Sequence, residues 1–238
     1  MRTDHRPLWL KRALTAYHEL WAERFLHPQF ESLGEGLIVF GPRHVEVNGP
    51  RIHLGKHVHM MATRDSPIRF TVYAQPGGRI ELGDYTIVLP GARLSSATRV
   101  RTGKNCMFAT HSYVTDADWH DIYDRTAAPG STAEVVLEDN VWIGDSAIVC
   151  KGVTIGENSV IGAGAVVASD IPKNSIAVGN PARVVKQIDP SRAMVTRESL
   201  FHGERPYERW IEDFERWVLG PNTLRNWLRS LLSPTRRH

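Results

Sequence analysis

The chain has 238 residues and a mass of 26.8 kDa, enough for one substantial hydrophobic core with additions at its ends. Its net charge of +3, from 29 basic and 26 acidic residues, gives no support to nucleic-acid binding. Two cysteines are too few for a disulfide scaffold and predict buried thiols in a reducing compartment. No apolar stretch is long enough to cross a bilayer and the N-terminus has no signal-peptide core, so the sequence predicts a cytoplasmic protein.

The first predicted element is an amphipathic helix over residues 8–26. Its apolar residues recur at helical spacing: Leu10, Leu14, Tyr17, Trp21 and Phe25. We assign residues 1–50 to an N-terminal helical and extended region that precedes the repeats.

A six-residue repeat dominates the centre of the chain. From Leu137 an aliphatic residue recurs every six positions, and a second, usually small residue follows four positions later. This period fits neither a helix nor a hairpin ladder, but it fits short strands joined by tight turns around a narrow interior. The aliphatic positions are Leu137, Ile143, Val149, Ile155, Ile161 and Val167, and their partners are Val141, Ala147, Val153, Ser159, Ala165 and Ile171.

The same repeat extends upstream, with a change of phase. Leu82, Val88 and Leu94 hold one phase, and a two-residue insertion shifts it to Thr102, Phe108 and Val114. A weaker start is visible at Leu54 and Met60. We therefore predict that the repeat domain covers residues 51–188.

Three segments of this domain carry a family resemblance. "VWIG", the hexapeptide run and "GNPARVV" resemble the hexapeptide-repeat acyltransferases, over about residues 80–188. The resemblance implies an all-β core folded as a left-handed parallel β-helix, a homotrimer, and acyl-coenzyme A bound in the groove between neighbouring subunits. Left-handed coiling follows from the resemblance alone, because general connection rules favour right-handed crossovers.

The repeat stops at Val114 and resumes at Leu137, so residues 115–136 are predicted to protrude as a loop. Loops on rigid scaffolds often carry catalytic groups. In the segment "VTDADWHDIYDR" we favour His120 as general base, since neutral imidazole accepts a proton near pH 7. The resemblance supports this choice, because many members of the family place a catalytic histidine in a segment similar to "TDADWH".

Two aspartates are candidates for orienting the His120 ring. In an extended segment Asp118 projects to the same side as His120 and would fix its tautomer. Asp116 is the alternative orienting residue. His111, inside the preceding coil, is the competing base, although a histidine there is more often structural.

The remaining charges of the loop are assigned more modest roles. Arg125 either binds an anionic acceptor or, as we favour, pairs with the aspartates. A cation site built from Asp116, Asp118, Asp121 and Asp124 would lack the early glycine and closing glutamate of a calcium loop, so no metal is expected.

The donor side is predicted near the end of the coil. Lys173, Arg183 and Lys186 are candidates for the phosphates of coenzyme A, and Gly179 lets a ligand approach the backbone closely. The resemblance places the coenzyme alongside "GNPAR" and the small coil residues Ala147 and Ala165. Trp142 lies either near the active-site loop or in a packing position.

Residues 189–238 are predicted to form a C-terminal helical extension. One amphipathic segment has Trp210, Phe214 and Trp217, and a second, "TLRNWLRSLLSPTRRH", is basic and has no acidic residue. We favour packing of this second segment against the β-helix and a neighbouring subunit, with contact to a membrane surface as the alternative. Its basic residues are Arg225, Arg229, Arg236 and Arg237.

The leading functional hypothesis is acetyl transfer from acetyl-coenzyme A to a hydroxyl, or less readily an amine, of a sugar-like acceptor. A zinc-dependent β-helix resembling the carbonic anhydrases is the second, suggested by His53, His57 and His59. A non-catalytic β-helix scaffold is the third. The sequence leaves open the acceptor and the length of the acyl donor.

Overall fold

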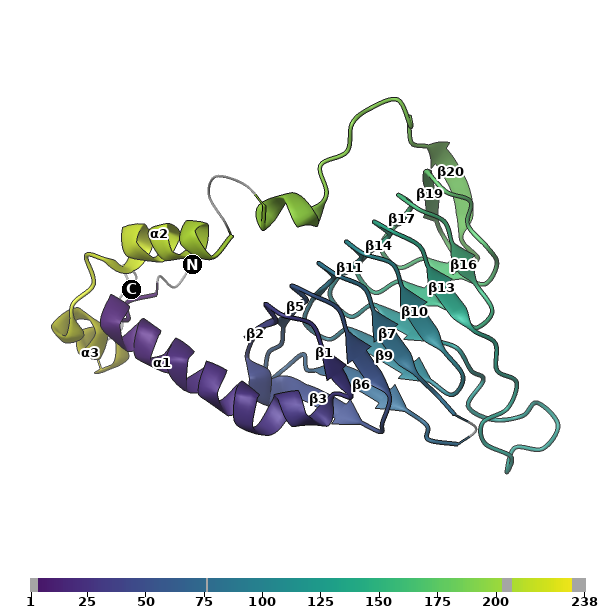
Figure 1. Cartoon of the computed structure of the whole chain (residues 1–238), viewed down its shortest axis with the longest axis horizontal. Helices are drawn as coiled ribbons and strands as arrows, with labels where there is room; N and C mark the ends of the chain where they lie inside the picture. The colour runs from purple at the N-terminus through teal and green to yellow at the C-terminus, as the bar shows by residue number, and fades with distance from the viewer. Residues whose placement is uncertain (1–3, 76, 203–206, 233–238) are drawn as a thin grey trace. The chain divides into compact units, whose positions relative to one another are not determined.

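The structure of the chain is a computed structural model that describes residues 4–75, 77–202 and 207–232 (Figure 1). Its contacts divide the chain into two compact units, Trp21–Arg197 and Met1–Leu20 with Glu198–His238. The first unit is a coil of short strands, and the second is helical.

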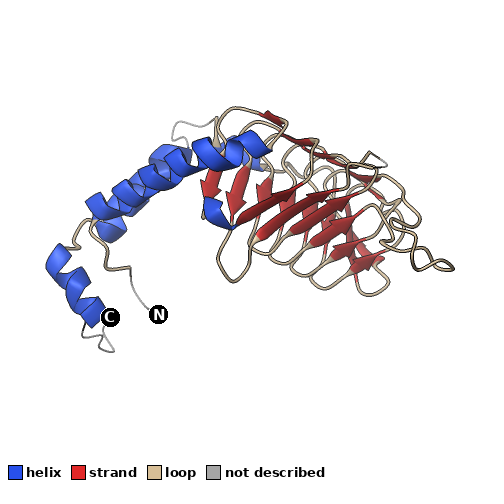
Figure 2. Ribbon diagram, turned by 90° about the horizontal axis from the view of Figure 1, so that it is seen from below, coloured by secondary structure: helices blue, strands red, loops and turns tan. Residues whose placement is uncertain are grey.

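Three sheets run along the coil, and each turn of the chain adds one strand to each sheet. Figure 2 shows the strands, in red, stacked side by side with turns between them. Sheet A orders β1 (Ser32–Leu33), β4 (Ile52–Leu54), β7 (Ile80–Leu82), β10 (Val100–Thr102), β13 (Val135–Leu137) and β16 (Thr154–Ile155). Sheet B orders β2 (Ile38–Phe40), β5 (His59–Met61), β8 (Ile87–Val88), β11 (Met107–Phe108), β14 (Trp142–Ile143), β17 (Val160–Ile161), β19 (Ser175–Val178) and β20 (Arg183–Gln187). Sheet C orders β18 (Val166–Val167), β15 (Ile148–Val149), β12 (Tyr113–Thr115), β9 (Arg93–Ser96), β6 (Ile68–Val72) and β3 (Val45–Asn48).

Strand register confirms the repeat. Leu137 pairs with Ile155, and Ile143 pairs with Ile161, so each hexapeptide supplies one strand with its turn and three hexapeptides complete one coil. Both members of each pair are buried. The small partner residues, Ser159 among them, are also buried, which confirms the narrow interior expected of a parallel β-helix.

The coil begins before the predicted boundary at residue 51. Strand β1 already pairs in parallel with β4, and β2 pairs with β5. The first coil therefore lies inside the region that the sequence assigned to residues 1–50. Its strands keep the six-residue interval at Leu33, Val39 and Val45, but Leu54 comes nine positions after Val45, so the phase breaks before the next coil.

The N-terminal end of the coil interior is closed by the residues that follow the first helix. Helix α1 (Leu8–Trp21) continues as the π-helix η1 (Ala22–Leu26) and the 3-10 helix η2 (His27–Gln29). Leu26 is fully buried, and Phe30 packs edge-on against Phe70 at a ring-centroid distance of 6.1 Å. The predicted helix over residues 8–26 is confirmed, and its last turn caps the core.

One corner of the coil is held by stacked asparagines. Asn140, Asn158 and Asn174 have φ angles of +58°, +61° and +56°, in the left-handed region that asparagine tolerates better than most residues. The Asn140 Nδ2 donates to Asn158 Oδ1 at 2.9 Å, and the Asn158 Nδ2 donates to Asn174 Oδ1 at 3.1 Å. Each coil is thereby tied to the next through side chains as well as through its strands.

The helical unit confirms the predicted C-terminal helices. Helices α2 (Tyr207–Leu219) and α3 (Leu224–Leu232) come after the 3-10 helix η4 (Arg197–Leu200). Another 3-10 helix, η3 (Pro42–His44), lies in the coil between β2 and β3. Arg12 of α1 pairs with Glu212 of α2 at 2.8 Å. Among the described residues, no helix has the length and apolar character to cross a membrane. The predicted basic residues Arg236 and Arg237 lie outside the described ranges.

Candidate active site

Loop 115–136 interrupts the coil between β12 and β13 and projects outward from it (Figure 1). Its two arms pair with each other in a short antiparallel bridge between Ala117 and Thr132. The Asp118 N–H donates to the Ser131 carbonyl at 2.8 Å, and the Gly130 N–H donates to the Asp118 carbonyl at 2.7 Å. The two arms of the loop therefore form a hydrogen-bonded stalk, which reaches from the coil to Asp118, two residues before His120.

His120 lies just beyond this stalk, with an exposed side chain. Its Nδ1 is 3.1 Å from the carbonyl oxygen of Arg125. Since a carbonyl can only accept, this contact requires the proton of the neutral ring to be on Nδ1. The Nε2 lone pair then faces outward without a partner among the described residues, which is the form that a general base requires.

The orienting group is not one of the two aspartates that the sequence suggested. Asp118 forms an ion pair with Lys151, with its Oδ2 2.7 Å from Nζ. Asp116 is fully buried, and neither carboxylate contacts the His120 ring. The backbone carbonyl of Arg125 occupies the place expected for a carboxylate.

Asp116 instead holds the adjacent coil together. Its carboxylate accepts hydrogen bonds from the Ser96 hydroxyl at 2.6 Å and from the Ala97 and Thr98 N–H groups at 2.7 and 2.9 Å. Three donors compensate for the cost of burying a charge. Asp116 thus anchors the point at which the loop leaves the coil.

Aromatic side chains hold the residue that precedes His120. The Trp119 indole N–H donates to the Tyr113 hydroxyl at 3.0 Å, and its ring lies 4.8 Å from that of Tyr73. The Arg93 guanidinium sits 4.3 Å above the Tyr113 ring, a cation–π contact. Together with the ion pair between Asp118 and Lys151, this aromatic clamp fixes two consecutive residues on the N-terminal side of His120.

Asp121 and Asp124 shape the tip of the loop. Asp121 accepts the N–H groups of Tyr123 and Asp124, and these bonds lower the pKa of its carboxyl. The side chain and the N–H of Thr126 bond to Asp124 and lower its pKa too. The loop aspartates are occupied by local hydrogen bonds rather than gathered around a common point.

The Arg125 guanidinium is exposed and forms no ion pair with a described residue. The favoured prediction that this side chain pairs with the loop aspartates is therefore wrong for this structure. Its backbone carbonyl is the group that acts on His120, and its side chain remains available to an anionic ligand.

His111, the competing base, lies at a corner of the coil. Its φ angle is +57°, and its Nε2 is 3.1 Å from the Ser66 hydroxyl oxygen. The ring lies against Gly91, where a Cβ would collide with it. Packing and the hydroxyl contact give His111 a structural role in the corner, although its side chain is exposed.

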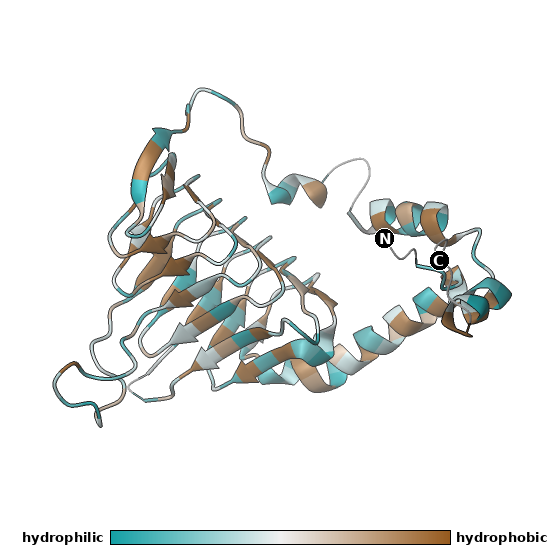
Figure 3. Cartoon of the chain, turned by 180° about the vertical axis from the view of Figure 1, so that it is seen from behind, coloured by the Kyte–Doolittle hydropathy of each residue, from teal (hydrophilic) through white to brown (hydrophobic). Residues whose placement is uncertain are grey.

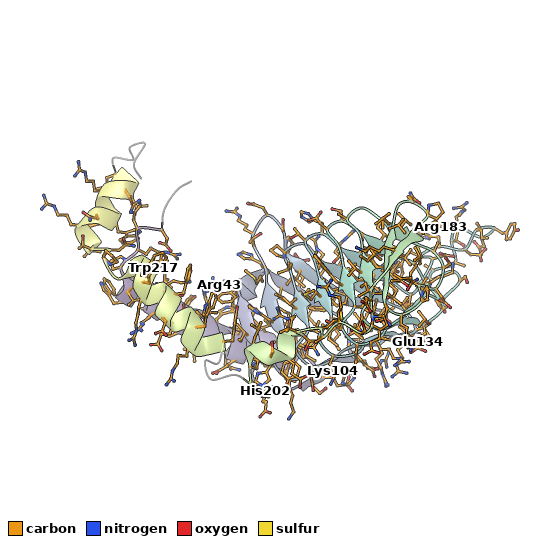
Figure 4. The ribbon with its side chains drawn as sticks, turned by 90° about the horizontal axis from the view of Figure 1, so that it is seen from above. Arg43, Lys104, Glu134, Arg183, His202 and Trp217 are labelled. Carbon is orange, nitrogen blue, oxygen red and sulfur yellow. The ribbon has the colours of Figure 1, made fainter. Side chains whose placement is uncertain are left out.

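The predicted donor-side residues are spread over several surfaces. Trp142 is 45% exposed on the outer face of sheet B, and Arg183, labelled in Figure 4, is exposed on β20. Gly179 has a φ angle of +94° in the turn between β19 and β20. Lys173 and Lys186 line two separate depressions of about 410 and 350 Å³.

Ala147 and Ala165 are fully buried inside the coil. Their side chains point into the core, where space is needed for the neighbouring aliphatic residues. Any contact from these positions to a coenzyme in an external groove therefore has to come from the backbone.

The three histidines of the metal hypothesis have separate surroundings. His53 Nδ1 is 2.9 Å from the Ser32 hydroxyl oxygen, and the His57 ring stacks on Tyr85 at 5.4 Å. His59 is buried beside Phe40. Within the described ranges, no group of three or more His, Cys, Asp or Glu residues is arranged to hold a metal ion.

Comparisons with known proteins agree with this architecture. Residues 134–169 match the family model "Bacterial transferase hexapeptide (six repeats)". The galactoside O-acetyltransferase of Escherichia coli is 28% identical over 169 residues, which cover 70% of this chain and 68% of that protein. A Schizosaccharomyces pombe relative is 62% identical over 53 residues, so the match spans only 26% of its length.

Among solved structures, a hexapeptide-repeat acetyltransferase of Vibrio cholerae complexed with acetyl coenzyme A is 22% identical. That match covers 75% of this chain and 87% of the other, with a TM-score of 0.49.

The register of the coil and the matched repeats define a parallel β-helix protein built from transferase hexapeptides. More particularly, the chain is similar to the galactoside O-acetyltransferases over about 70% of its length, and its repeats match those of the hexapeptide transferases.

Proposed function

We propose that this chain transfers an acetyl group from acetyl-coenzyme A to a hydroxyl, or less readily an amine, of a sugar-like acceptor. The observation that carries the proposal is the state of His120. In the neutral ring, the contact with the Arg125 carbonyl places the proton on Nδ1 and leaves the Nε2 lone pair to accept a proton. The acceptor class is supported by the E. coli relative, which is named for O-acetylation of galactosides.

In the proposed reaction, His120 Nε2 takes the proton of the acceptor hydroxyl as its oxygen attacks the thioester carbonyl. A new carbon–oxygen bond forms, and the carbonyl electrons move onto the oxygen of a tetrahedral intermediate. Collapse of that intermediate breaks the carbon–sulfur bond. The proton held by His120 passes to the departing coenzyme A thiolate, which restores the neutral ring.

The donor would lie along the outer groove of the coil. Lys173, Arg183 and Lys186 provide cations for its phosphates, and the exposed ring of Trp142 provides an apolar surface for the pantetheine arm. Since these residues are spread over several surfaces of one chain, we propose that the groove is completed by a neighbouring subunit of a homotrimer. The proposed location is the cytoplasm, where acetyl-coenzyme A is available.

A thiol-release assay with acetyl-coenzyme A and a panel of sugars, nucleotide sugars and aminoglycosides tests the proposal. We expect release that depends on the acceptor and a product heavier by one acetyl group in mass spectrometry. A protein that neither binds acetyl-coenzyme A nor releases thiol with any acceptor would contradict it. Zinc analysis of the same preparation distinguishes acetyl transfer from the zinc-dependent activity that the histidines suggested. Sedimentation measures the oligomeric state and so tests the proposed homotrimer.

A further inference from the structure

Helix α3 has an apolar face that the described residues cover only in part. At 100° per residue its leucines and its tryptophan fall within an arc of about 140°. Leu231 and Leu232 are 60% and 82% exposed, and Leu224 and Leu228 are each nearly half exposed. Figure 3 shows the brown apolar and teal polar residues of the terminal helices.

The helix is also well formed at its N-terminus. The Thr223 hydroxyl accepts the Asn226 N–H at 3.2 Å, and the Trp227 N–H donates to the Thr223 carbonyl at 3.0 Å. Asn222, directly before this cap, donates to the carbonyls of Asp4 and Arg6 at 2.7 and 3.0 Å. The N-terminal end of α3 is therefore tied to the rest of the helical unit while its apolar face stays partly exposed.

The charges beside this face are all positive. Arg225 and Arg229 are one helical turn apart at the same edge of the apolar arc, and neither forms an ion pair with a described residue. In the sequence, the residues after Glu215 include five arginines and no aspartate or glutamate.

Helix α2 shows the contrast within the same unit. It too has exposed aromatic side chains, including Trp217, labelled in Figure 4. However, this helix carries charges of both signs, and Glu212 and Glu215 pair with α1, the latter with Lys11 at 3.7 Å. Of the described helices α2 and α3, α3 is the one whose exposed apolar face is flanked by charges of a single sign.

We propose that α3 binds the surface of a membrane that contains anionic lipids. The leucines and Trp227 would enter the boundary between headgroups and acyl chains, and Arg225 and Arg229 would lie at the level of the lipid phosphates. A second copy of α3 is a poorer occupant, because symmetric contact would bring the unpaired arginines of both copies together. No described helix is long enough to span the bilayer, so the contact is with the surface.

Vesicle flotation of the full chain tests this inference. One set of vesicles contains phosphatidylcholine alone, and the other contains phosphatidylcholine with phosphatidylglycerol. We expect binding to the mixed vesicles only, weakening as salt is raised. The double variants Leu228→Gln/Leu231→Gln and Arg225→Glu/Arg229→Glu should each reduce the bound fraction at limiting lipid by at least about tenfold.

Two variants serve as controls. Arg225→Lys/Arg229→Lys keeps the charge and should bind like wild type, and so should Ile122→Gln, which changes an exposed apolar residue of the loop. Circular dichroism checks that every variant is folded. Wild-type protein that ignores anionic vesicles, or variants that bind as well as wild type, would overturn the inference. Loss of self-association in the leucine variant without vesicle binding by wild type would show that a second copy covers the face.

Discussion

The coil and loop 115–136 are stabilised in opposite ways. In the coil, strands β1 to β19 pair in parallel with those of the next turn, and most hexapeptides send one aliphatic side chain into a single apolar column. Within loop 115–136, only Val135, at the C-terminal end where β13 begins, belongs to that column. The loop is held by a short stalk, an aromatic clamp and carboxylates that bond to nearby backbone groups.

Because of this difference, the coil determines the stability of the fold, whereas the loop positions the proposed catalytic residue. Loss of an apolar residue from the coil affects the folding of many turns at once, because the core is continuous. A change in the loop alters the position of His120 while leaving the column intact. Asp116 is the exception, since it stands at the junction and belongs to the coil by its contacts.

The largest loss of stability is expected from Asp116→Ala, because it removes the acceptor of three donors, two of which belong to the buried residues Ser96 and Ala97. We expect the free energy of unfolding to fall by about 4 kcal/mol. Asp116→Asn, which keeps one acceptor oxygen, should cost about half as much. Urea denaturation of both variants measures this, and a loss below about 1 kcal/mol for the alanine variant would show that the junction relaxes without Asp116.

A matched pair of isoleucines compares coil and loop directly. Ile155 is fully buried and Ile122 is 68% exposed. Ile155→Ala should lower the free energy of unfolding by about 3 kcal/mol through lost burial and a cavity. Ile122→Ala should change it by less than about 0.5 kcal/mol. Equal effects in denaturant titrations would mean that loop and coil share one core.

The coil also contains a pH-sensitive group. Burial, with the charge of Arg197 as the smaller cause, lowers the pKa of His59 from 6.5 to about 4. Because the unfolded chain takes up the proton first, stability is fully present above pH 6.5 and is lost as the pH falls toward 4. This loss amounts to up to about 3 kcal/mol.

The His59 contribution is measured by unfolding wild type and His59→Gln across this pH range. The variant should lose less stability on acidification than wild type. Parallel curves for the two proteins would contradict the assignment to His59.

The smallest effect concerns the aromatic clamp. Trp119→Phe removes the N–H that bonds Tyr113 but keeps the ring beside Tyr73. We expect kcat to fall about tenfold with an unchanged KM for acetyl-coenzyme A, since His120 is positioned less well. Tyr113→Phe should have the same effect, and the double variant should be no worse than either single variant. Additive losses would mean that the two residues act separately.

The coil was predictable because the side chains that form its core recur at a short, regular interval in the sequence. The six-residue spacing from Leu137 to Ile171 reports directly which side chains share the interior. The first coil was missed although Leu33, Val39 and Val45 keep that spacing, because the run has only three members and is out of phase with Leu54.

The candidate site was predictable only in part. The break in the repeat located the loop, and the chemistry of imidazole selected His120. Its partners were not visible, because the bond to Arg125 depends on a loop turn and the clamp brings Tyr73 from another coil. Gly130 is a further example. A Cβ at this position would lie 2.5 Å from the His120 carbonyl oxygen, but nothing in the sequence indicates that these two residues are in contact.

The most direct test of the account is the turnover of His120→Ala with acetyl-coenzyme A and the best acceptor of the panel. We predict that kcat falls by at least about a hundredfold while the Kd for acetyl-coenzyme A and the unfolding temperature remain those of wild type. Turnover equal to that of wild type would contradict the role of His120 as the base.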